Sequence, residues 1–423
     1  MKPEIKQRIK QIKAGQVPDG YKRTKIGIIP TEWEEKRIGD VLTQRKTLMC
    51  VSKDAPLLSF TIEEGVIEPE NKKSNKRDFL IKDISTKKFA LTEKGDIIYN
   101  PANLKFGAIH RNNLRRGVLS PIYGIFYGEQ NSEFMGYLLH NQRFIDYAKI
   151  YTEGTVEKLK TLKADTFLRL KIVLPPLAEQ EKIVKILSTK DRIIELYQRK
   201  IEELQKMKKI YLSKMFPKKG KNAPEWRFSQ FNDSWEQRKL GEVADVYDGV
   251  HQTPFYTDSG IMFLSVENIG TLKSNKYISE EAFNRDYKVY PQKGDILMTR
   301  IGDVGTPNVV ETSERVAFYV SLALLKPSIV DSYFLCNSIL SPFFQSGLKE
   351  RTLITAIPQK INKDEIGKVR LFLPSSTDEQ VKIGDFFRHL DNLITLHQRK
   401  LEENKKYKNA LMQLLLTGIV RCK

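Results

Sequence analysis

The stretch closest to a catalytic motif is Asp96–Asn103, in which Asn100 is followed by Pro101. An amino-group DNA methyltransferase presents Asn or Asp, two prolines and an aromatic side chain to a base flipped out of the duplex. Only the Asn-Pro half is present, and no Gly-rich turn between a strand and a helix offers a seat for a nucleotide or adenosyl cofactor. We interpret Asn100 as a turn or nucleic-acid contact residue and not as a catalytic one.

No other stretch offers a complete active site or metal site. The run Gly302-Asp303-Val304-Gly305 lacks the Lys-Ser/Thr of a phosphate loop, so a turn is the simpler interpretation. The three cysteines are odd in number and far apart, which favours free thiols in a reducing compartment. The histidines, which do not cluster with cysteines at metal-ligand spacing, are His110, His140, His251, His389 and His397. We therefore predict no catalytic residue and no metal ligand on this chain.

Basic and amide side chains, which hold phosphates and read base edges, gather in two parts of the chain. Those in the first part are Lys72, Lys73, Asn75, Lys76, Arg77, Asn100, Asn103, Lys105, Arg111, Asn112, Arg115 and Arg116. Those in the second part are His251, Gln252, Thr253, Lys273, Asn275, Lys276 and Arg300. For any one of these residues the alternative interpretation is an ordinary solvated surface residue. The prediction of a nucleic-acid interface therefore rests on the clusters. We expect the cluster from Arg111 to Arg116 to lie next to Asn100, Asn103 and Lys105.

The net charge supports the same class of partner. The chain has 71 Lys plus Arg against 52 Asp plus Glu, a formal charge of +19, which favours a polyanion and nucleic acid first. A membrane surface also attracts cations, but no apolar run approaches the 18 or more residues of a spanning helix, and the N-terminus lacks an apolar signal core. We expect a soluble, cytoplasmic protein with no membrane partner, long enough at 423 residues for two or three domains.

Two long amphipathic stretches must position these clusters. A heptad seam with alternating steps of four and three runs along the first stretch, and its members include Ile183, Leu187, Ile194, Tyr197, Ile201 and Leu204. Their counterparts in the second are Ile383, Phe387, Leu390, Ile394, Leu401 and Asn404, 200 residues later. Both copies carry Gln-Arg-Lys, at Gln198 and Gln398. We predict two long helices that pair through these seams; the alternative is that each lies on its own domain.

The rest of the chain is repeated too. Trp33-Glu34 and Trp235-Glu236 open the two repeats, and Lys94-Gly95-Asp96 recurs as Lys293-Gly294-Asp295, each a turn that feeds a buried strand. Leu-Pro precedes each long helix, whose first turn holds Glu179 or Glu379, where a carboxylate suits the helix dipole. Between these marks we predict strands at Leu57–Ile62, Pro121–Tyr127 and Ile261–Val266, and helices at Ser132–Ala148 and Asp331–Leu340. This irregular order favours an α+β fold.

Connectivity then predicts the architecture. It is α+β, with two globular α+β domains separated by a pair of long antiparallel coiled-coil helices and an internal pseudo-twofold repeat. The helices run antiparallel because the second domain follows the end of the first helix, and the second helix must run back to pair with it. The predicted parts are an N-terminal basic helix (1–19), a first domain (20–175), a first long helix (176–216), a linker (217–224), a second domain (225–374), a second long helix (375–418) and a tail (419–423).

The order and doubling of these motifs resemble the specificity subunit of type I restriction-modification systems. The resemblance implies that each globular domain is a target-recognition domain for one half of a bipartite site in double-stranded DNA. It also implies that the helices set the spacing and dock the modification subunits. Two modification subunits would then methylate adenine with S-adenosylmethionine, and two restriction subunits would translocate and cleave DNA with ATP and Mg²⁺. This chain would bind no cofactor and would not itself be an enzyme.

Two other functions remain as alternatives. A stand-alone DNA adenine methyltransferase is disfavoured by the incomplete Asn-Pro motif. A coiled-coil scaffold that binds RNA or DNA would share the basic charge and the long helices, but it would show no preference for a split duplex sequence.

Overall fold

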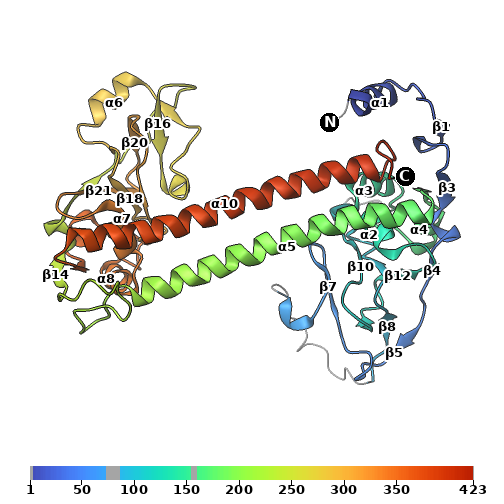
Figure 1. Cartoon of the computed structure of the whole chain (residues 1–423), viewed down its shortest axis with the longest axis horizontal. Coiled ribbons are helices and arrows are strands. Elements are labelled where there is room, and N and C mark those ends of the chain that lie inside the picture. The colour runs from blue at the N-terminus through green and yellow to red at the C-terminus, as the bar shows by residue number, and fades with distance from the viewer. Residues whose placement is uncertain (1–2, 73–85, 154–159, 423) are drawn as a thin grey trace. The chain divides into compact units, whose positions relative to one another are not determined.

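The computed structural model describes residues 3–72, 86–153 and 160–422. The chain divides into two compact units, and the first combines both ends of the chain: Met1–Leu196 with Glu402–Lys423. The second unit is one continuous segment, Tyr197–Leu401. Each unit therefore contains one globular domain and a part of each long helix, and Figure 1 labels their elements.

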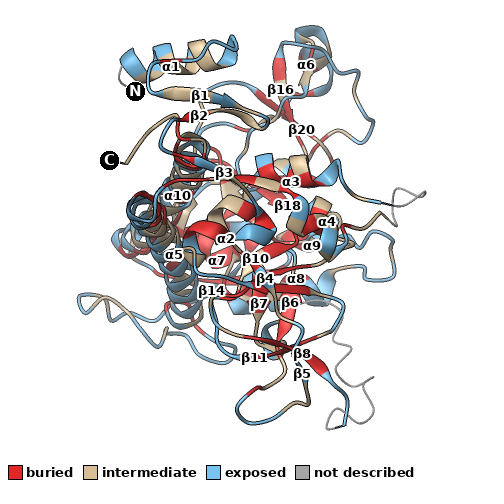
Figure 2. Cartoon of the chain, turned by 90° about the vertical axis from the view of Figure 1, so that its right-hand side faces the viewer, coloured by how far each residue is buried: buried red, intermediate tan, exposed pale blue. Residues whose placement is uncertain are grey.

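The first unit alternates short strands with short helices. Before its long helix it contains α1 (Pro3–Lys13), β1 (Tyr21–Thr24), β2 (Gly27–Pro30), β3 (Glu34–Arg37), β4 (Thr43–Gln44), β5 (Leu48–Met49), β6 (Ser59–Thr61), β7 (Gly65–Ile67), β8 (Phe89–Thr92), β9 (Ile97–Tyr99), β10 (Ile109–Arg111), β11 (Gly117–Leu119), β12 (Gly124–Tyr127), α2 (Ser132–His140), α3 (Gln142–Lys149), α4 (Ala164–Arg169) and β13 (Lys171–Leu174). The basic helix α1 has no buried residue (Figure 2).

The second unit repeats this plan. Its elements are β14 (Glu236–Lys239), β15 (Ala244–Asp248), β16 (Ile261–Leu264), β17 (Tyr277–Ile278), α6 (Glu280–Asp286), β18 (Ile296–Thr299), β19 (Pro307–Val309), β20 (Val316–Phe318), β21 (Leu322–Pro327), α7 (Ser332–Ile339), α8 (Pro342–Arg351), α9 (Lys363–Gly367) and β22 (Arg370–Leu373). The two long helices, α5 (Leu177–Lys214) and α10 (Thr377–Leu415), have 38 and 39 residues.

A four-stranded sheet lies at the centre of each unit, with the same strand order in both. The order is β4-β12-β9-β10 in the first unit and β15-β21-β18-β19 in the second. In the first unit, β4 and β9 both pair antiparallel with β12 and therefore run in the same direction. In the second, β15 and β18 run in the same direction for the same reason, because both pair antiparallel with β21.

The repeated Lys-Gly-Asp motif forms the same turn in both sheets. Gly95 and Gly294 take positive φ values of +100° and +95°, which glycine adopts at little cost. The next residue closes the turn, because Asp96 accepts from Glu93 N–H and Asp295 accepts from Gln292 N–H, both at 2.8 Å. A buried strand follows in each unit, as predicted.

One predicted helix is wrong. The stretch Ser132–Ala148 is two helices, α2 and α3, because Asn141 between them has an extended backbone. Its side chain accepts a hydrogen bond from Arg143 N–H (2.9 Å) and so caps the start of α3. An asparagine side chain competes for backbone hydrogen bonds in this way and interrupts a helix. The spacing of apolar residues continues across the interruption and therefore does not reveal it. The helix expected at Asp331–Leu340 is present as α7, with Asp331 as its N-cap.

The long helices pair antiparallel, as predicted, and contacts within each unit show it (Figure 1). In the first unit Asp191 pairs with Lys408 (2.5 Å), whereas Glu179, near the start of α5, meets Arg421 beyond the end of α10. In the second unit Lys208 pairs with Asp391 (2.6 Å). The rings of Tyr197 and His397 lie 5.7 Å apart. Compared with the pair Lys208–Asp391, Tyr197 is earlier on α5 and His397 is later on α10, as antiparallel helices require.

Most seam residues are buried, and many also join the core of a globular domain. Ile183 and Leu187 pack in one cluster with Trp33 and Leu415 of the first unit. Leu204, Ile383, Phe387, Leu390 and Ile394 belong to the core of the second unit, and Ile201 and Leu401 are buried as well. Ile194, Tyr197 and Asn404 are half-buried. The seam residues therefore pack between the two helices and also against the globular domains. Both alternatives that the heptad pattern allowed, pairing of the helices and packing of each helix on a domain, are present.

Candidate nucleic-acid interface

Strand direction creates one distinctive edge on each central sheet. Because β4 and β9 run in the same direction, the segments that follow them leave the same edge of the first sheet. The segments that follow β15 and β18 do so in the second sheet. We call these the loop edges. The first comprises residues 100–108, and the second comprises residues 249–257 and 300–305 together with residues 352–361, in which Lys360 pairs with Ile301.

The first loop edge carries Asn100, Asn103 and Lys105 of the predicted interface. Asn100 accepts a hydrogen bond from Ala102 N–H (3.0 Å), an Asx turn that shapes the hairpin between β9 and β10. Lys105 places its Nζ 5.3 Å from the ring of Phe106, which is exposed. Amide groups, a cation and an aromatic face can contact phosphate and bases, but they do not form a catalytic constellation.

The expectation that the cluster Arg111–Arg116 lies next to Asn100 is wrong. Arg111 pairs with Ile97 at the far end of the β9–β10 hairpin. Asn100 lies in the closed loop of that hairpin, whereas β10 carries the chain to the opposite edge of the sheet before the cluster begins. Residues near in sequence are separated because a strand intervenes.

The side chains of that cluster also bond within the first unit. Arg115 makes two hydrogen bonds to Glu68 (2.9 and 2.8 Å), and Arg116 makes one to Glu93 (2.8 Å). Arg111 donates to the hydroxyl of Ser132 (3.0 Å). Asn112 is buried and donates to Thr92 Oγ1 (3.1 Å) and Arg115 O (2.9 Å), so its amide stabilises the fold.

Another cluster is only partly described. Lys72 is half-buried. Lys73, Asn75, Lys76 and Arg77 lie outside the described residues.

In the second unit the side chain of Arg300 is buried and bonds to residues at the ends of two loops. Its guanidinium pairs with Asp248, the last residue of β15, and its Nε donates to Ile361 O (3.1 Å). Ile361 N–H in turn donates to Arg300 O (3.0 Å). Burial lowers the pKa of Arg300 because the charged form loses hydration. Arg300 thus positions the loop edge and does not face solvent.

The structure brings together the other two predicted clusters of the second unit. Thr257 N–H donates to Tyr277 O (2.9 Å), which ties residues 249–257 to the strand that follows Lys276. Lys276 also lies 5.7 Å from the Tyr256 ring and pairs with Glu267 (2.7 Å). The remaining members, His251, Gln252, Thr253, Lys273 and Asn275, are exposed.

Sequence reasoning missed apolar residues on this same loop edge. Phe255, Leu353, Ile354 and Ile357 are exposed on the two loops that Arg300 joins. They occur among Thr, Pro and Gln residues, and Pro358 follows directly after the helical spacing of Leu353, Ile354 and Ile357. An apolar group that is interrupted by a proline was the available signal.

Sequence reasoning also missed the partners of the first-turn glutamates. Glu179 accepts from Arg421 (2.8 Å from both Nε and Nη2), Trp33 Nε1 (2.9 Å) and Cys422 N–H (3.0 Å). Burial raises the pKa of Glu179, but these hydrogen bonds outweigh it and hold that pKa below its ordinary value. In the second unit Arg227 donates twice to Glu379, at 2.6 and 2.7 Å. The repeated Trp and Glu were a signal, but their pairing was not visible in the sequence.

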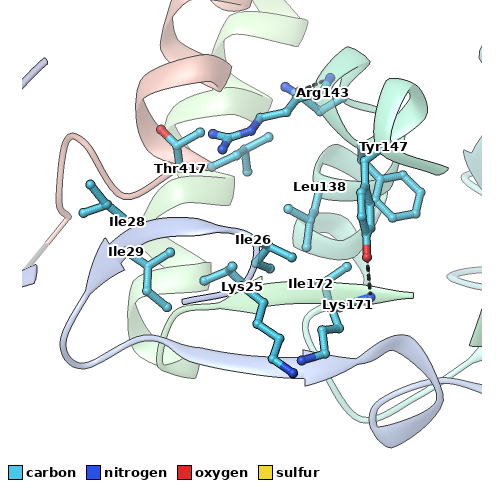
Figure 3. Close-up of a pocket in the computed structure, with 14 residues that line it drawn as sticks. Lys25, Ile26, Ile28, Ile29, Leu138, Arg143, Tyr147, Lys171, Ile172 and Thr417 are labelled. Carbon is cyan, nitrogen blue, oxygen red and sulfur yellow. Dashed lines mark hydrogen bonds between the residues drawn. The ribbon is translucent and has the colours of Figure 1, made fainter. Parts of the chain in front are cut away.

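The first unit also contains a cavity of about 290 Å³ between the β1–β2 hairpin, α3, β13 and the end of α10 (Figure 3). Apolar side chains such as Ile28, Leu138 and Ile172 line it, with Arg143 and Lys171 among the cationic residues. At the positions of Arg143 and Val173, which also line the cavity, the second repeat has Phe343 and Phe372. The centroids of these two rings lie 4.7 Å apart.

Within the described residues no three His, Cys, Asp or Glu side chains gather to hold a metal ion. In that same part of the chain no helix has the length and hydropathy to cross a membrane.

Comparison with known proteins gives consistent results. The family described as "Type I restriction modification DNA specificity domain" matches residues 30–206 and 232–405. The type I restriction enzyme MjaVIII specificity subunit of Methanocaldococcus jannaschii is 28% identical over 319 residues, which cover 70% of this chain and 73% of that protein.

Two solved structures have a similar fold. The S subunit of a type I restriction-modification system from M. genitalium has a TM-score of 0.61 at 15% identity, covering 90% of this chain and 96% of that one. A chain from a study of complex assembly and conformational transition of the type I R-M system has a TM-score of 0.54 at 18% identity, covering 93% and 99%. At these identities the likeness shows the fold alone.

Proposed function

The chain belongs to the family of type I restriction-modification DNA specificity subunits, and on this basis we propose that each unit reads one half of a bipartite DNA site with its loop edge. The observation that carries the proposal is the repetition of this edge. Each family-matched repeat contains the same four-stranded sheet, and polar and exposed aromatic side chains follow its parallel-running strands. The net charge of +19 suits the phosphate backbone.

The catalytic steps belong, in this proposal, to partner subunits. Two modification subunits methylate adenine with S-adenosylmethionine, and two restriction subunits use ATP and Mg²⁺ to translocate and cleave DNA. The incomplete motif at Asn100 supports this division, because its amide closes an Asx turn with Ala102. The isolated chain, mixed with S-adenosylmethionine and DNA, should transfer no methyl group; transfer would favour the stand-alone methyltransferase.

We further propose that α5 and α10 set the gap between the two half-sites. At about 1.5 Å per residue each helix is about 57–59 Å long, which exceeds one turn of DNA, about 34–36 Å. A matched insertion of one heptad after Ile201 and before Leu401 keeps the seam in register. It should lengthen the unread gap and leave both half-site sequences unchanged.

Methylome sequencing tests the proposal directly. The chain is expressed with its modification subunits, and methylated adenines should fall in a split sequence with two fixed halves. Exchanging residues 225–374 for those of a relative should change one half only. A continuous target, or a change in both halves, would contradict the proposal.

Salt dependence provides a second measurement. If about 6–10 phosphates are contacted, the affinity of the assembled complex for its site should fall by about 10³–10⁵ between 50 and 200 mM salt. Affinity that does not change with salt would contradict a phosphate-dominated interface.

A further inference from the structure

The second loop edge exposes an unusual group of apolar side chains. Phe255 is 94% exposed, Ile354 72% and Ile357 100%. A single exposed apolar residue is ordinary on a protein surface, but these three lie on two loops at the same edge of one sheet. Buried Arg300 joins the loops, because it pairs with Asp248 at the start of one and donates to Ile361 O at the end of the other.

Hydrogen bonds fix the loop that carries the two isoleucines. Leu353 N–H donates to Lys360 O (2.8 Å) and closes its base. Gln359 bonds twice to Gly302: Gly302 N–H donates to Gln359 O (2.8 Å), and Gln359 Nε2 donates to Gly302 O (3.0 Å). The apolar tip is therefore presented in one position, and less ordering is required when a partner binds.

The surroundings of the tip are those of a nucleic-acid surface. His251 and Gln252 are exposed on the loop that bears Phe255, and exposed Lys360 lies at the base of the loop that bears Ile357. Such side chains donate to phosphates and base edges, so this surface suits a polyanionic partner. Duplex DNA offers both surfaces, since its phosphates surround apolar stacked base faces and thymine methyl groups.

We propose that Ile354 and Ile357, together with Phe255, form an apolar wedge that enters the DNA at the half-site read by the second unit and partly unstacks a base step. Inserted Ile, Leu or Phe side chains open base steps in this way and kink the duplex. The inference rests on the proposed function and deepens it. It assigns a deformation of the DNA to the second unit, which would favour sequences with easily unstacked steps.

The test uses the full chain assembled with its modification subunits and a duplex that carries the site found by methylome sequencing. 2-Aminopurine is placed in turn at each position of the second half-site other than the methylated adenine and the bases next to it, since methylation itself takes that adenine out of the stack. We expect fluorescence to rise at one step with the wild-type chain, and this rise to be lost with the double variant Ile354→Ser/Ile357→Ser. Affinity should fall about tenfold, the size of one lost base-pair contact. Phe255→Ser should reduce both readouts in the same direction.

Ile329→Ser is the matched control. Ile329 is 59% exposed and follows β21, which runs opposite to β15 and β18, so it lies at the other edge of the same sheet. This variant should keep the fluorescence rise and the affinity, and thermal melts should show all variants folded.

Different results would overturn different claims. No fluorescence rise with the wild-type chain, or a rise that the double variant retains, would refute the wedge. Continued methylation of the bipartite site would still leave the proposed function standing. A double variant that loses its modification subunits would show that the loop docks protein, which also refutes the wedge. Absence of a bipartite site would instead contradict the proposed function.

Discussion

The two units share a central sheet and a turn, and they differ in the contacts made at the start of each long helix and in the loops. Both have the same central sheet and the same Lys-Gly-Asp turn. In the first unit Glu179 of α5 accepts four hydrogen bonds, three of them from Arg421 and Cys422, whereas Glu379 accepts two, both from Arg227. Trp33 donates to Glu179, but its counterpart Trp235 has a buried Nε1 that finds no hydrogen-bond partner among the described residues. The comparison shows that both repeats bind the glutamate in the first turn of the long helix, but with hydrogen-bond donors from different parts of the chain.

The largest difference between the units is expected at the arginines of this contact. Arg227→Ala leaves the buried Glu379 carboxylate without its two hydrogen bonds and should lower the free energy of unfolding of the second unit by about 3–5 kcal/mol. Arg421→Ala should lower that of the first unit by about 2 kcal/mol, because Trp33 and Cys422 still donate to Glu179. Hydrogen exchange measured separately on peptides of each unit reports both values.

Arg238→Ala is the control for that pair of variants. Arg238 bonds to Glu236 on the surface, so its loss should change the free energy of unfolding by less than about 0.5–1 kcal/mol. Equal losses from Arg227→Ala and Arg421→Ala would show that the extra donors to Glu179 do not matter.

The second difference is at the loop edges. Pro101 O accepts from Leu162 N–H, and Arg300 O accepts from Ile361 N–H, so the backbone link is common to both units. In the second unit the buried guanidinium of Arg300 adds an ion pair with Asp248. Arg300→Ala should lower the free energy of unfolding of the second unit by about 3 kcal/mol, near the low end for a broken buried pair because Asp248 keeps some solvent contact.

Pro101→Ala provides the comparison in the first unit and should cost less than about 1 kcal/mol. Hydrogen exchange on residues 249–257 and 353–361 checks the Arg300 variant, since both loops should lose protection together. Loss in only one loop would mean that Arg300 does not join them.

The sequence predicted those parts of the units that depend on local chemistry. Heptad spacing identified the seam, and glycine followed by aspartate identified the Lys-Gly-Asp turn, because period and turn residues act within a few positions. The burial of Arg300 and the placement of Arg111 away from Asn100 were not predicted. Arg300 meets a residue 52 positions away, and Arg111 is placed by strand register, neither of which spacing along the chain encodes.

The third difference concerns pH. His110 and His140 lie with ring centroids 4.4 Å apart in the first unit. Burial, followed by the neighbouring charge of His140, lowers the pKa of His110 to about 4, and burial also lowers that of His140. Strand register places Asn308 of the second unit where the first has His110, since they pair with the corresponding Leu297 and Ile98.

Because the folded-state pKa lies below the unfolded value of about 6.5, the unfolded chain binds protons first as pH falls. The stability of the first unit should therefore be constant above about pH 6.5 and decline towards pH 4, by about 2 kcal/mol at pH 5 from His110. Denaturant unfolding between pH 7.5 and 5 measures this. His110→Asn should remove most of the decline, and a variant that keeps all of it would exclude His110 as the cause.

The smallest difference is at the cavity of about 290 Å³ in the first unit, where Arg143 and Val173 stand at the positions of Phe343 and Phe372 of the second repeat. Arg143→Phe/Val173→Phe installs the second repeat's residues in the first. Filling a cavity commonly adds about 0.5–2 kcal/mol, so a gain of about 1 kcal/mol in the free energy of unfolding is expected. A loss would mean that the hairpin β1–β2 cannot accommodate both rings, since overpacking costs about 1–3 kcal/mol. Val173→Ala, which enlarges the cavity, should move stability in the opposite direction and shows whether the walls of the cavity collapse or hold their shape.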